Sequence, residues 1–260
     1  MNNLLDVKLN RLCGIDVVHG DSLKIGAPKH FAKHDEILSH GAAVTLATLL
    51  LNGMAFRYRL MPDGRRAILG FLVPGDFLIP IFPLPQKLDY AVATLTHCEA
   101  ADVPLASIFD VTTSNPRVAY ALASCAELDA TIQRDWLATI GQCNAEKRIA
   151  RLFCELRQRL ELVGLADREG FNFPMTQQDL ADAMGLSVVH ANRVMQNLRR
   201  QKLIRTFGEK IYFPNLDELE RLADFTRYEC FGDRRTASSS EDFPQHDISA
   251  SPPRSQQIGH

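Results

Sequence analysis

The segment from Thr176 to Arg205 constrains the fold most, because its capping and small residues suit two short helices that cross closely. Thr176 is a suitable N-cap, and Asp179 three residues later can complete a capping box. Gly185 suits the turn, since it tolerates a positive φ, and Ser187 caps a second helix expected over 187–200. Positions at helical spacing form a buried face, namely Leu180, Ala181, Met184, Ala191, Val194 and Leu198. The pattern predicts a helix-turn-helix.

The charge of this segment indicates its partner. From Leu186 to Gly208 there is no acidic residue, and the cations are Arg193, Arg199, Arg200, Lys202 and Arg205. Residues 145–215 hold 12 Lys and Arg against 8 Asp and Glu, a net charge of +4, and the rest of the chain is −6. Such a basic module suits contact with DNA phosphates, whereas the alternative is an ordinary helical hairpin with a solvated basic face.

The bulk composition is that of a globular chain. Its 260 residues can hold two domains. The six cysteines contain no C-x-x-C pair, so we expect reduced thiols, with Cys125 and Cys143 as candidates for redox control. No apolar run reaches the ~20 residues of a membrane span, and the first residues lack a signal-peptide pattern. We therefore expect a cytoplasmic protein with no membrane partner.

The first half of the chain predicts short strands. Residues 1–27 form an amphipathic helix and a linker, and residues 28–114 alternate short strands with turns. Strands are expected over 44–52, 54–60, 66–72, 90–96 and 99–103. The turns Pro62-Asp63-Gly64 and Pro74-Gly75-Asp76 punctuate them. This spacing predicts a small antiparallel barrel or sandwich.

The second half predicts helices. Asn115-Pro116 opens a long helix, assigned with a hinge to residues 115–142, and Gly141 is expected to break it. A coiled-coil spacing predicts a dimer seam at Val118, Leu122, Cys125, Asp129, Ile132 and Trp136, which Asp129 interrupts. A winged helix-turn-helix over 144–217 starts with a helix at 145–162 and ends with a two-stranded wing at 203–206 and 210–213. A last helix is expected near 216–225, with the C-terminal helical segment assigned to 218–231, and a disordered tail is expected over 232–260.

In this order of parts, the chain resembles the Crp/Fnr family of bacterial transcription regulators over residues 22–228. The resemblance rests on Asp63–Arg66, Pro74–Phe77, Trp136–Ala138, Ala145–Leu152 and Thr176–Ile204. It implies an α+β fold with an N-terminal antiparallel β-barrel of jelly-roll type, a long dimerisation helix and a C-terminal winged helix-turn-helix. It also implies a homodimer that binds an inverted repeat in double-stranded DNA, with RNA polymerase as a further partner.

The resemblance also assigns residues to the DNA interface. The family carries an arginine six residues after the capping Ser or Thr, here Arg193, which can bind guanine O6 and N7 together. Asn192 matches a base-contacting position of Fnr-like members. Val188 and Val189 depart from the family's glutamate or arginine, which implies a different consensus, and His190 suits a base, a phosphate or solvent. The expected DNA-binding residues are Thr176, Gln177, Gln178, Ser187, Val188, Val189, His190, Asn192, Arg193 and Arg199.

Cofactor patterns of the family are not matched. Members that bind cyclic AMP carry an acidic residue after the Pro-Gly-Asp-like turn and a later Arg-Ser or Arg-Thr pair. Here Phe77–Ile81 follows the turn, and residues 87–91 contain no arginine. Cys13 is alone where the oxygen-sensing branch has a cysteine cluster, so neither an iron–sulfur cluster nor another cofactor is expected.

The sequence bears on two other function classes. A small-molecule or redox sensor whose barrel is the working part is the alternative to a transcription regulator. An enzyme is not expected, because the sequence contains no cupin His-x-His, no G-x-S-x-G and no P-loop.

Overall fold

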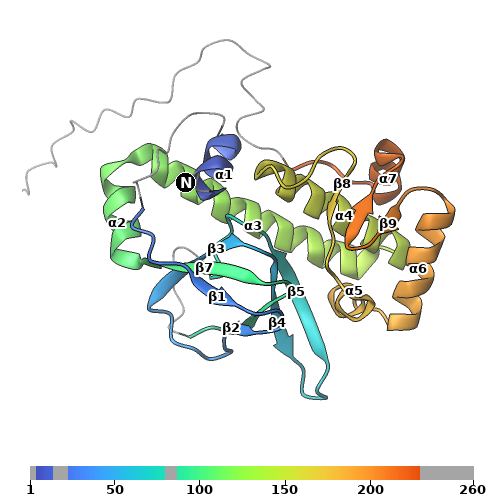
Figure 1. Ribbon diagram of the computed structural model, residues 1–260, viewed down its shortest axis with the longest axis horizontal. Coiled ribbons are helices and arrows are strands. Elements are labelled where there is room, and N and C mark those ends of the chain that lie inside the picture. The colour runs from blue at the N-terminus through green and yellow to red at the C-terminus, as the bar shows by residue number, and fades with distance from the viewer. Residues whose placement is uncertain (1–3, 14–22, 80–86, 229–260) are drawn as a thin grey trace, which may run out of the picture.

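A computed structural model describes residues 4–13, 23–79 and 87–228. Helix α1 (Leu4–Cys13) is followed by two antiparallel sheets, with strand orders β1-β7-β3 and β2-β6-β4-β5 (Figure 1). The strands are β1 (Lys29–Phe31), β2 (Glu36–Leu38), β3 (Leu46–Asn52), β4 (Ala55–Leu60), β5 (Arg66–Leu72), β6 (Ala91–Thr94) and β7 (Cys98–Pro104). The expected antiparallel, jelly-roll-like architecture is confirmed as a sandwich that is not closed into a barrel.

The β4–β5 hairpin lies at the edge of the sandwich nearest the C-terminal helices, and its tip projects below the body of the molecule (Figure 1). Its turn is closed by the Met61 N–H, which donates to the Arg65 carbonyl at 2.8 Å, and Gly64 takes the positive φ of +81° that the turn requires. Strand β5 therefore starts at Arg66, opposite Leu60. This register places Arg66 where the hairpin meets the C-terminal module, defined here as α4 through α7.

Helices α2 (Leu105–Ser114) and α3 (Pro116–Gln142) follow the sandwich. The Asn115 side chain caps α3 by accepting from the Arg117 N–H at 3.1 Å. The expected break between the two helices is found, but it comes after Gln142 and not at Gly141, so that Cys143 and Asn144 separate α3 from α4. A glycine costs an α-helix only about 1 kcal/mol, which the packing of a long helix can offset.

The predicted dimer seam on α3 is also wrong. Val118, Leu122, Cys125, Ile132 and Trp136 are all buried within this one chain, against α1, the sandwich and α4. Asp129, which interrupts the seam, accepts both of its bonds from the Arg57 guanidinium, at 2.9 and 3.0 Å. The spacing identified a buried stripe correctly, but periodicity does not show whether the same chain or a second copy covers that stripe.

The C-terminal module contains α4 (Ala145–Leu162), α5 (Gln177–Met184), α6 (Val188–Arg200) and α7 (Leu216–Ala223). Its sheet has the order β8-β10-β9, with β8 (Gly170–Asn172), β9 (Arg205–Phe207) and β10 (Lys210–Tyr212). Strand β8 was not expected from the sequence. The helix expected near 216–225 is found at Leu216–Ala223, and it stops short of residue 231, the assigned end of that segment, because Asp224 takes a left-handed φ of 49°. The tail expected over 232–260 lies outside the described residues.

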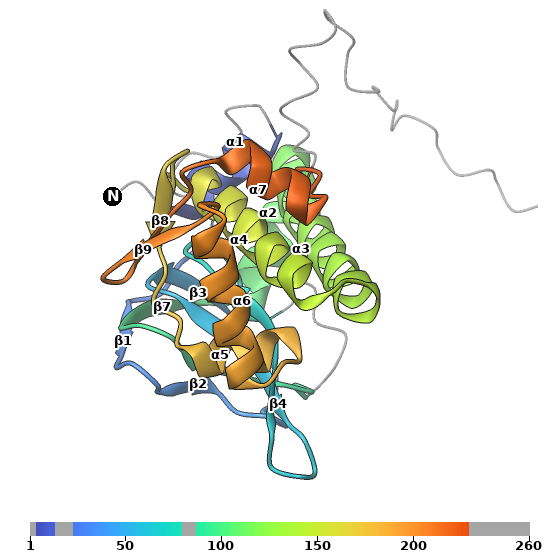
Figure 2. The same ribbon diagram turned by 90° about the vertical axis from the view of Figure 1, so that its right-hand side faces the viewer.

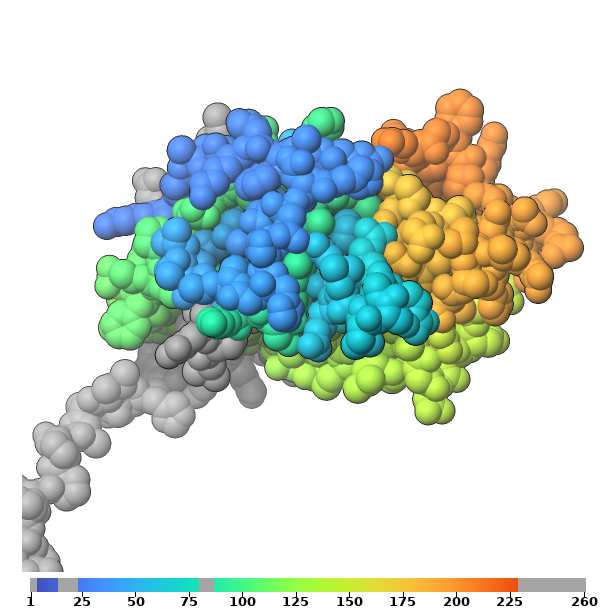
Figure 3. All heavy atoms as spheres, turned by 90° about the horizontal axis from the view of Figure 1, so that it is seen from below, coloured from blue at the N-terminus to red at the C-terminus, as the bar shows by residue number. Residues whose placement is uncertain are grey.

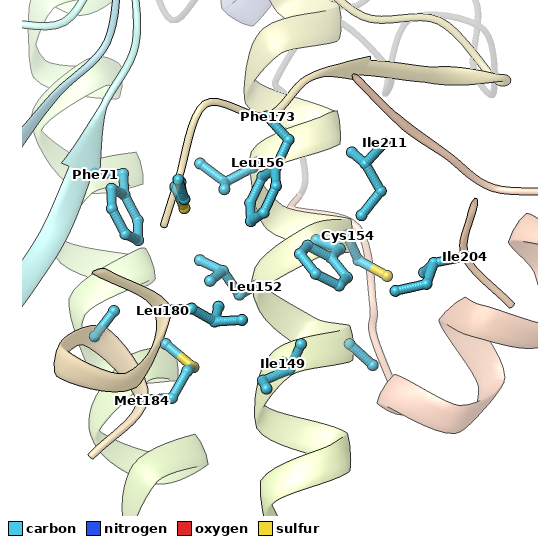
Figure 4. Packing of buried hydrophobic residues seen from close by; sticks show 14 of the residues in the cluster. Phe71, Ile149, Leu152, Cys154, Leu156, Phe173, Leu180, Met184, Ile204 and Ile211 are labelled. Atoms are coloured by element: carbon cyan, nitrogen blue, oxygen red, sulfur yellow. The ribbon is translucent and has the colours of Figure 1, made fainter. Parts of the chain in front are cut away.

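The sandwich and the C-terminal module share one hydrophobic core. Figure 4 shows Phe71 of β5 beside Leu152 and Leu156 of α4, with Leu180 and Met184 of α5 in the same layer. All five side chains are at most 2% exposed. The two halves of the molecule therefore pack against each other as one body.

Candidate nucleic-acid interface

Local hydrogen bonds fix the helix-turn-helix as the sequence predicts. The Asp179 N–H donates to the Thr176 hydroxyl at 3.1 Å and the Thr176 N–H donates to the Asp179 carboxylate at 3.0 Å, which completes the capping box. Gly185 ends α5 with a φ of +63°, and the Ser187 hydroxyl accepts from the His190 N–H at 3.2 Å. The predicted inward residues of both helices are buried. The motif is therefore confirmed as a structural unit.

Helix α6 presents one face to solvent. Its back is covered by Ala191, Val194 and Leu198, whereas Val189 is 71% and Val188 38% exposed. The other predicted contact residues of this helix and its cap are also exposed, namely Ser187, His190, Asn192, Arg193 and Arg199. The structure thus brings all seven onto one accessible surface of the module.

The two arginines of this face are uncommitted. Among the described residues, no hydrogen bond or ion pair engages the guanidinium of Arg193 or of Arg199. Arg200, by contrast, donates to the Asn197 amide oxygen at 2.8 Å. Free guanidinium groups on an exposed helix are available for base edges and phosphates.

The start of α5 contributes less than its sequence suggests. Thr176 is exposed, but its hydroxyl is used by the capping box and donates to Asp179 at 2.6 Å. Gln178 is exposed and donates its amide to Asp182 at 2.6 Å, while Gln177 is half-buried. These residues can therefore bind an external phosphate mainly through the backbone N–H groups at the N-terminus of α5.

The wing adds a feature that the sequence did not single out. Phe207, at the tip of the β9–β10 hairpin, is 75% exposed. Arg205 and Lys210 are exposed beside it. Lys202 takes a left-handed φ of 60° after α6 and turns the chain into this hairpin. The cationic surface therefore continues from α6 into the wing.

The N-terminal sandwich borders a cavity of about 230 Å³ next to α3. The cations that line it are paired: Lys8 binds the Asp76 carboxylate and Arg57 binds Asp129. Phe77 and Ile79, which follow the Pro74-Gly75-Asp76 turn, are buried. Most of the remaining sequence between this turn and Lys87, residues 80–86, lies outside the described residues.

The two cysteines proposed for redox control differ. Burial raises the pKa of the Cys125 thiol to about 11. Cys125 is therefore protonated and shielded at neutral pH, which makes it a poor nucleophile. Cys143 lies between α3 and α4 and is partly exposed.

Comparison with known proteins places both halves of the chain. A model of the cyclic nucleotide-binding domain matches residues 28–115, and a model of the Crp-like helix-turn-helix domain matches residues 147–222. The chain belongs to the Crp/Fnr family of transcription regulators. Its α5 and α6 accordingly belong to the helix-turn-helix DNA-binding domain of this family.

Relatives of the family align over most of the chain. The nitrogen fixation regulation protein FixK of Bradyrhizobium diazoefficiens is 29% identical over 203 residues, which cover 76% of this chain and 83% of FixK. The transcriptional activatory protein AadR of Rhodopseudomonas palustris is 27% identical over 72% of this chain and 77% of AadR. The solved structure of FixK2 from Bradyrhizobium japonicum shares the fold, with a TM-score of 0.69 at 22% identity over 79% of this chain and all of that one.

No helix among the described residues is long and apolar enough to cross a membrane.

Proposed function

We propose that this Crp/Fnr regulator is a homodimer that places α6 in the major groove of each half of an inverted repeat, and that it binds DNA without a cyclic nucleotide. The observation that carries the proposal is the exposed face of α6. Its buried back is fixed by the core, and its two arginines, Arg193 and Arg199, are exposed. In Figure 1, α6 lies at the same end of the molecule as the C-terminus of α3.

The residues of this face suit different parts of the duplex. Arg193 supplies a bidentate contact to guanine, and Asn192 next to it supplies an amide for a base edge. Val188 and Val189 suit thymine methyl groups. Arg199, one to two turns further along, suits phosphate, as do the N-terminal N–H groups of α5 at Gln177 and Gln178.

A different face of α3 suits the dimer. On the face of α3 that flanks the buried stripe, a second coiled-coil spacing runs through Ala123, Ala126, Ala130, Gln133, Leu137 and Ile140. Leu137 is 78% and Ile140 36% exposed, and the alanines allow two helix backbones to approach closely. Figure 3 shows the yellow-green half of α3 uncovered along one edge of the molecule. A second copy packed there would bring two α6 helices to one side of the dimer.

The cavity beside α3 supports binding without a cyclic nucleotide. At about 230 Å³ it is smaller than the roughly 300–1,000 Å³ of typical ligand pockets. A cyclic phosphate would also have to displace Asp76 from Lys8 or Asp129 from Arg57, so its binding would break buried ion pairs.

RNA polymerase is proposed as the further partner. The name of AadR describes a transcriptional activator, and that of FixK a regulator of nitrogen fixation. Activation at a promoter requires that a DNA-bound protein favours the polymerase.

Selection of bound sites from random duplexes tests the proposed function. The purified protein, without added nucleotide, is expected to enrich an inverted repeat whose half-site centres are about 10–11 bp apart, one turn of the duplex. Enrichment of single half-sites would contradict the dimer. Failure to enrich any sequence would favour the alternative, a sensor whose sandwich is the working part.

A further inference from the structure

Arg66, the first residue of β5, bonds the N-terminal sandwich directly to the helix-turn-helix. Its Nε donates to Asp182 at 2.8 Å and its Nη2 donates to Asp179 at 2.6 Å, both on α5. The guanidinium also lies over the Phe56 ring, 4.9 Å from the centroid. The side chains of Asp179 and Asp182 are 5% and 14% exposed, so these charge-assisted bonds are largely shielded from water.

Asp179 serves two purposes at once. One carboxylate oxygen accepts from the Thr176 N–H and hydroxyl and so starts α5, and the other accepts from Arg66. Burial opposes ionisation, but the Thr176 hydrogen bonds and Arg66 outweigh it and hold the pKa of Asp179 below its usual range. The group that begins the helix therefore also docks that helix on the sandwich.

This docking leaves the DNA-facing surface open. Figure 2 shows α5 beside the β4–β5 hairpin, with α6 extending away from it. The apolar core around Phe71 holds the two halves together, but the hydrophobic effect has no preferred direction. The two ion pairs of Arg66 have a fixed geometry, so they define the orientation of α5, and α6 is packed on α5.

We propose that Arg66 is a positioning residue for DNA recognition: it orients the helix-turn-helix on the sandwich, so that the separation of the two α6 helices is set before DNA binds. This inference rests on the proposed function, since only a dimer on two half-sites needs that separation. A preset separation avoids an ordering cost when the second half-site is engaged.

Arg66→Met tests the inference, because methionine retains apolar contact with Phe56 and removes both ion pairs. Arg65→Met is the matched control: Arg65 is the neighbouring residue, its side chain is 82% exposed, and its ion pair is with Asp63 in the same turn. Affinity is measured for a duplex with one half-site, for the selected inverted repeat, and for repeats with 1 or 2 bp added between the half-sites.

The wild type is expected to bind the full repeat much more tightly than one half-site and to discriminate against altered spacing. Arg66→Met should keep the half-site affinity. The ratio of its affinity for the full repeat to its affinity for one half-site should be about tenfold lower than in the wild type, and it should discriminate less between spacings. Arg65→Met should match the wild type. A purely structural role would instead lower the half-site affinity as well.

The outcomes separate the two ideas. The positioning role is wrong if Arg66→Met still prefers the full repeat over one half-site as strongly as the wild type and discriminates spacings equally well. It is also wrong if the affinities for the half-site and for the full repeat fall by the same factor. If the wild type gains nothing from the second half-site, the proposed dimeric recognition is wrong and the inference falls with it. Asp182→Asn, combined with Arg66→Met, should add little to the single change if the two residues act as one contact.

Discussion

Asp76→Asn tests whether a buried ion cluster joins the two halves of the molecule. Asp76 lies in the Pro74-Gly75-Asp76 turn and accepts from the Lys8 ammonium of α1, from Arg159 of α4 at 2.5 Å and from the Val73 N–H at 2.8 Å. Arg159 also donates to Glu155 at 2.7 Å. The side chains of Lys8, Asp76, Arg159 and Glu155 are all under 10% exposed, and their charges balance.

The substitution leaves one buried positive charge without a partner. Removing one member of a buried ion pair costs about 3–5 kcal/mol, and two cations depend on Asp76, so we expect the free energy of unfolding to fall by about 4 kcal/mol at pH 7. For a chain of this size that corresponds to a fall in Tm of about 10 °C. The control Asp63→Asn, in an exposed turn, should leave Tm unchanged.

The pH dependence gives a second reading of the same cluster. Burial alone would raise the pKa of Asp76, but Lys8 and Arg159 outweigh it and hold that pKa well below its usual range. A carboxylate with a depressed pKa stabilises the fold above its unfolded pKa of about 3.9, and this stabilisation is lost as pH falls through the folded pKa. The difference in the free energy of unfolding between wild type and Asp76→Asn should therefore become smaller in acid. Denaturant unfolding that shows a gap below about 1 kcal/mol at pH 7 would refute the reasoning.

Three further predictions concern the DNA interface, the dimer and the thiols. Arg193→Ala should lose about 1–3 kcal/mol of discrimination per half-site in fluorescence anisotropy, whereas Arg199→Ala should weaken all sequences alike; equal behaviour of the two variants would contradict their assigned roles. Leu137→Glu should shift the protein towards monomer in sedimentation velocity at unchanged helix content, and a persistent dimer would place the interface elsewhere. In the native protein iodoacetamide should modify Cys143 well before Cys125, because burial raises the pKa of Cys125 to about 11. Mass spectrometry follows the labelling, and early modification of Cys125 would contradict its burial.

The helix-turn-helix could be predicted closely because its determinants are local. The caps at Thr176 and Ser187 and the turn at Gly185 each act within three or four residues, so their pattern is visible in the sequence. The strands 66–72 and the helix 145–162 were likewise found at the predicted positions, since turn and capping residues bound them.

The contacts between the halves could not be predicted, because they join residues far apart in the chain. Arg66 meets α5 across more than 110 residues, and before the structure it was only part of a family motif. The apolar stripe on α3 could be identified from the sequence, but the elements that pack on it could not. Residues of α1 and the sandwich bury this stripe in the same way as a helix of a second copy would. Strand β8 was missed because three residues, Gly170–Asn172, carry too little pattern to be recognised.

The central claim is that the exposed, preset α6 face binds DNA without a cyclic nucleotide, and one titration tests it most directly. Purified, reduced protein is titrated onto its selected inverted repeat alone, with cyclic AMP and with cyclic GMP, at one salt concentration. We expect tight binding without nucleotide and no more than about a twofold change in affinity with either nucleotide. A rise of tenfold or more, about 1.4 kcal/mol, would contradict it, because a ligand would then be selecting the DNA-competent state.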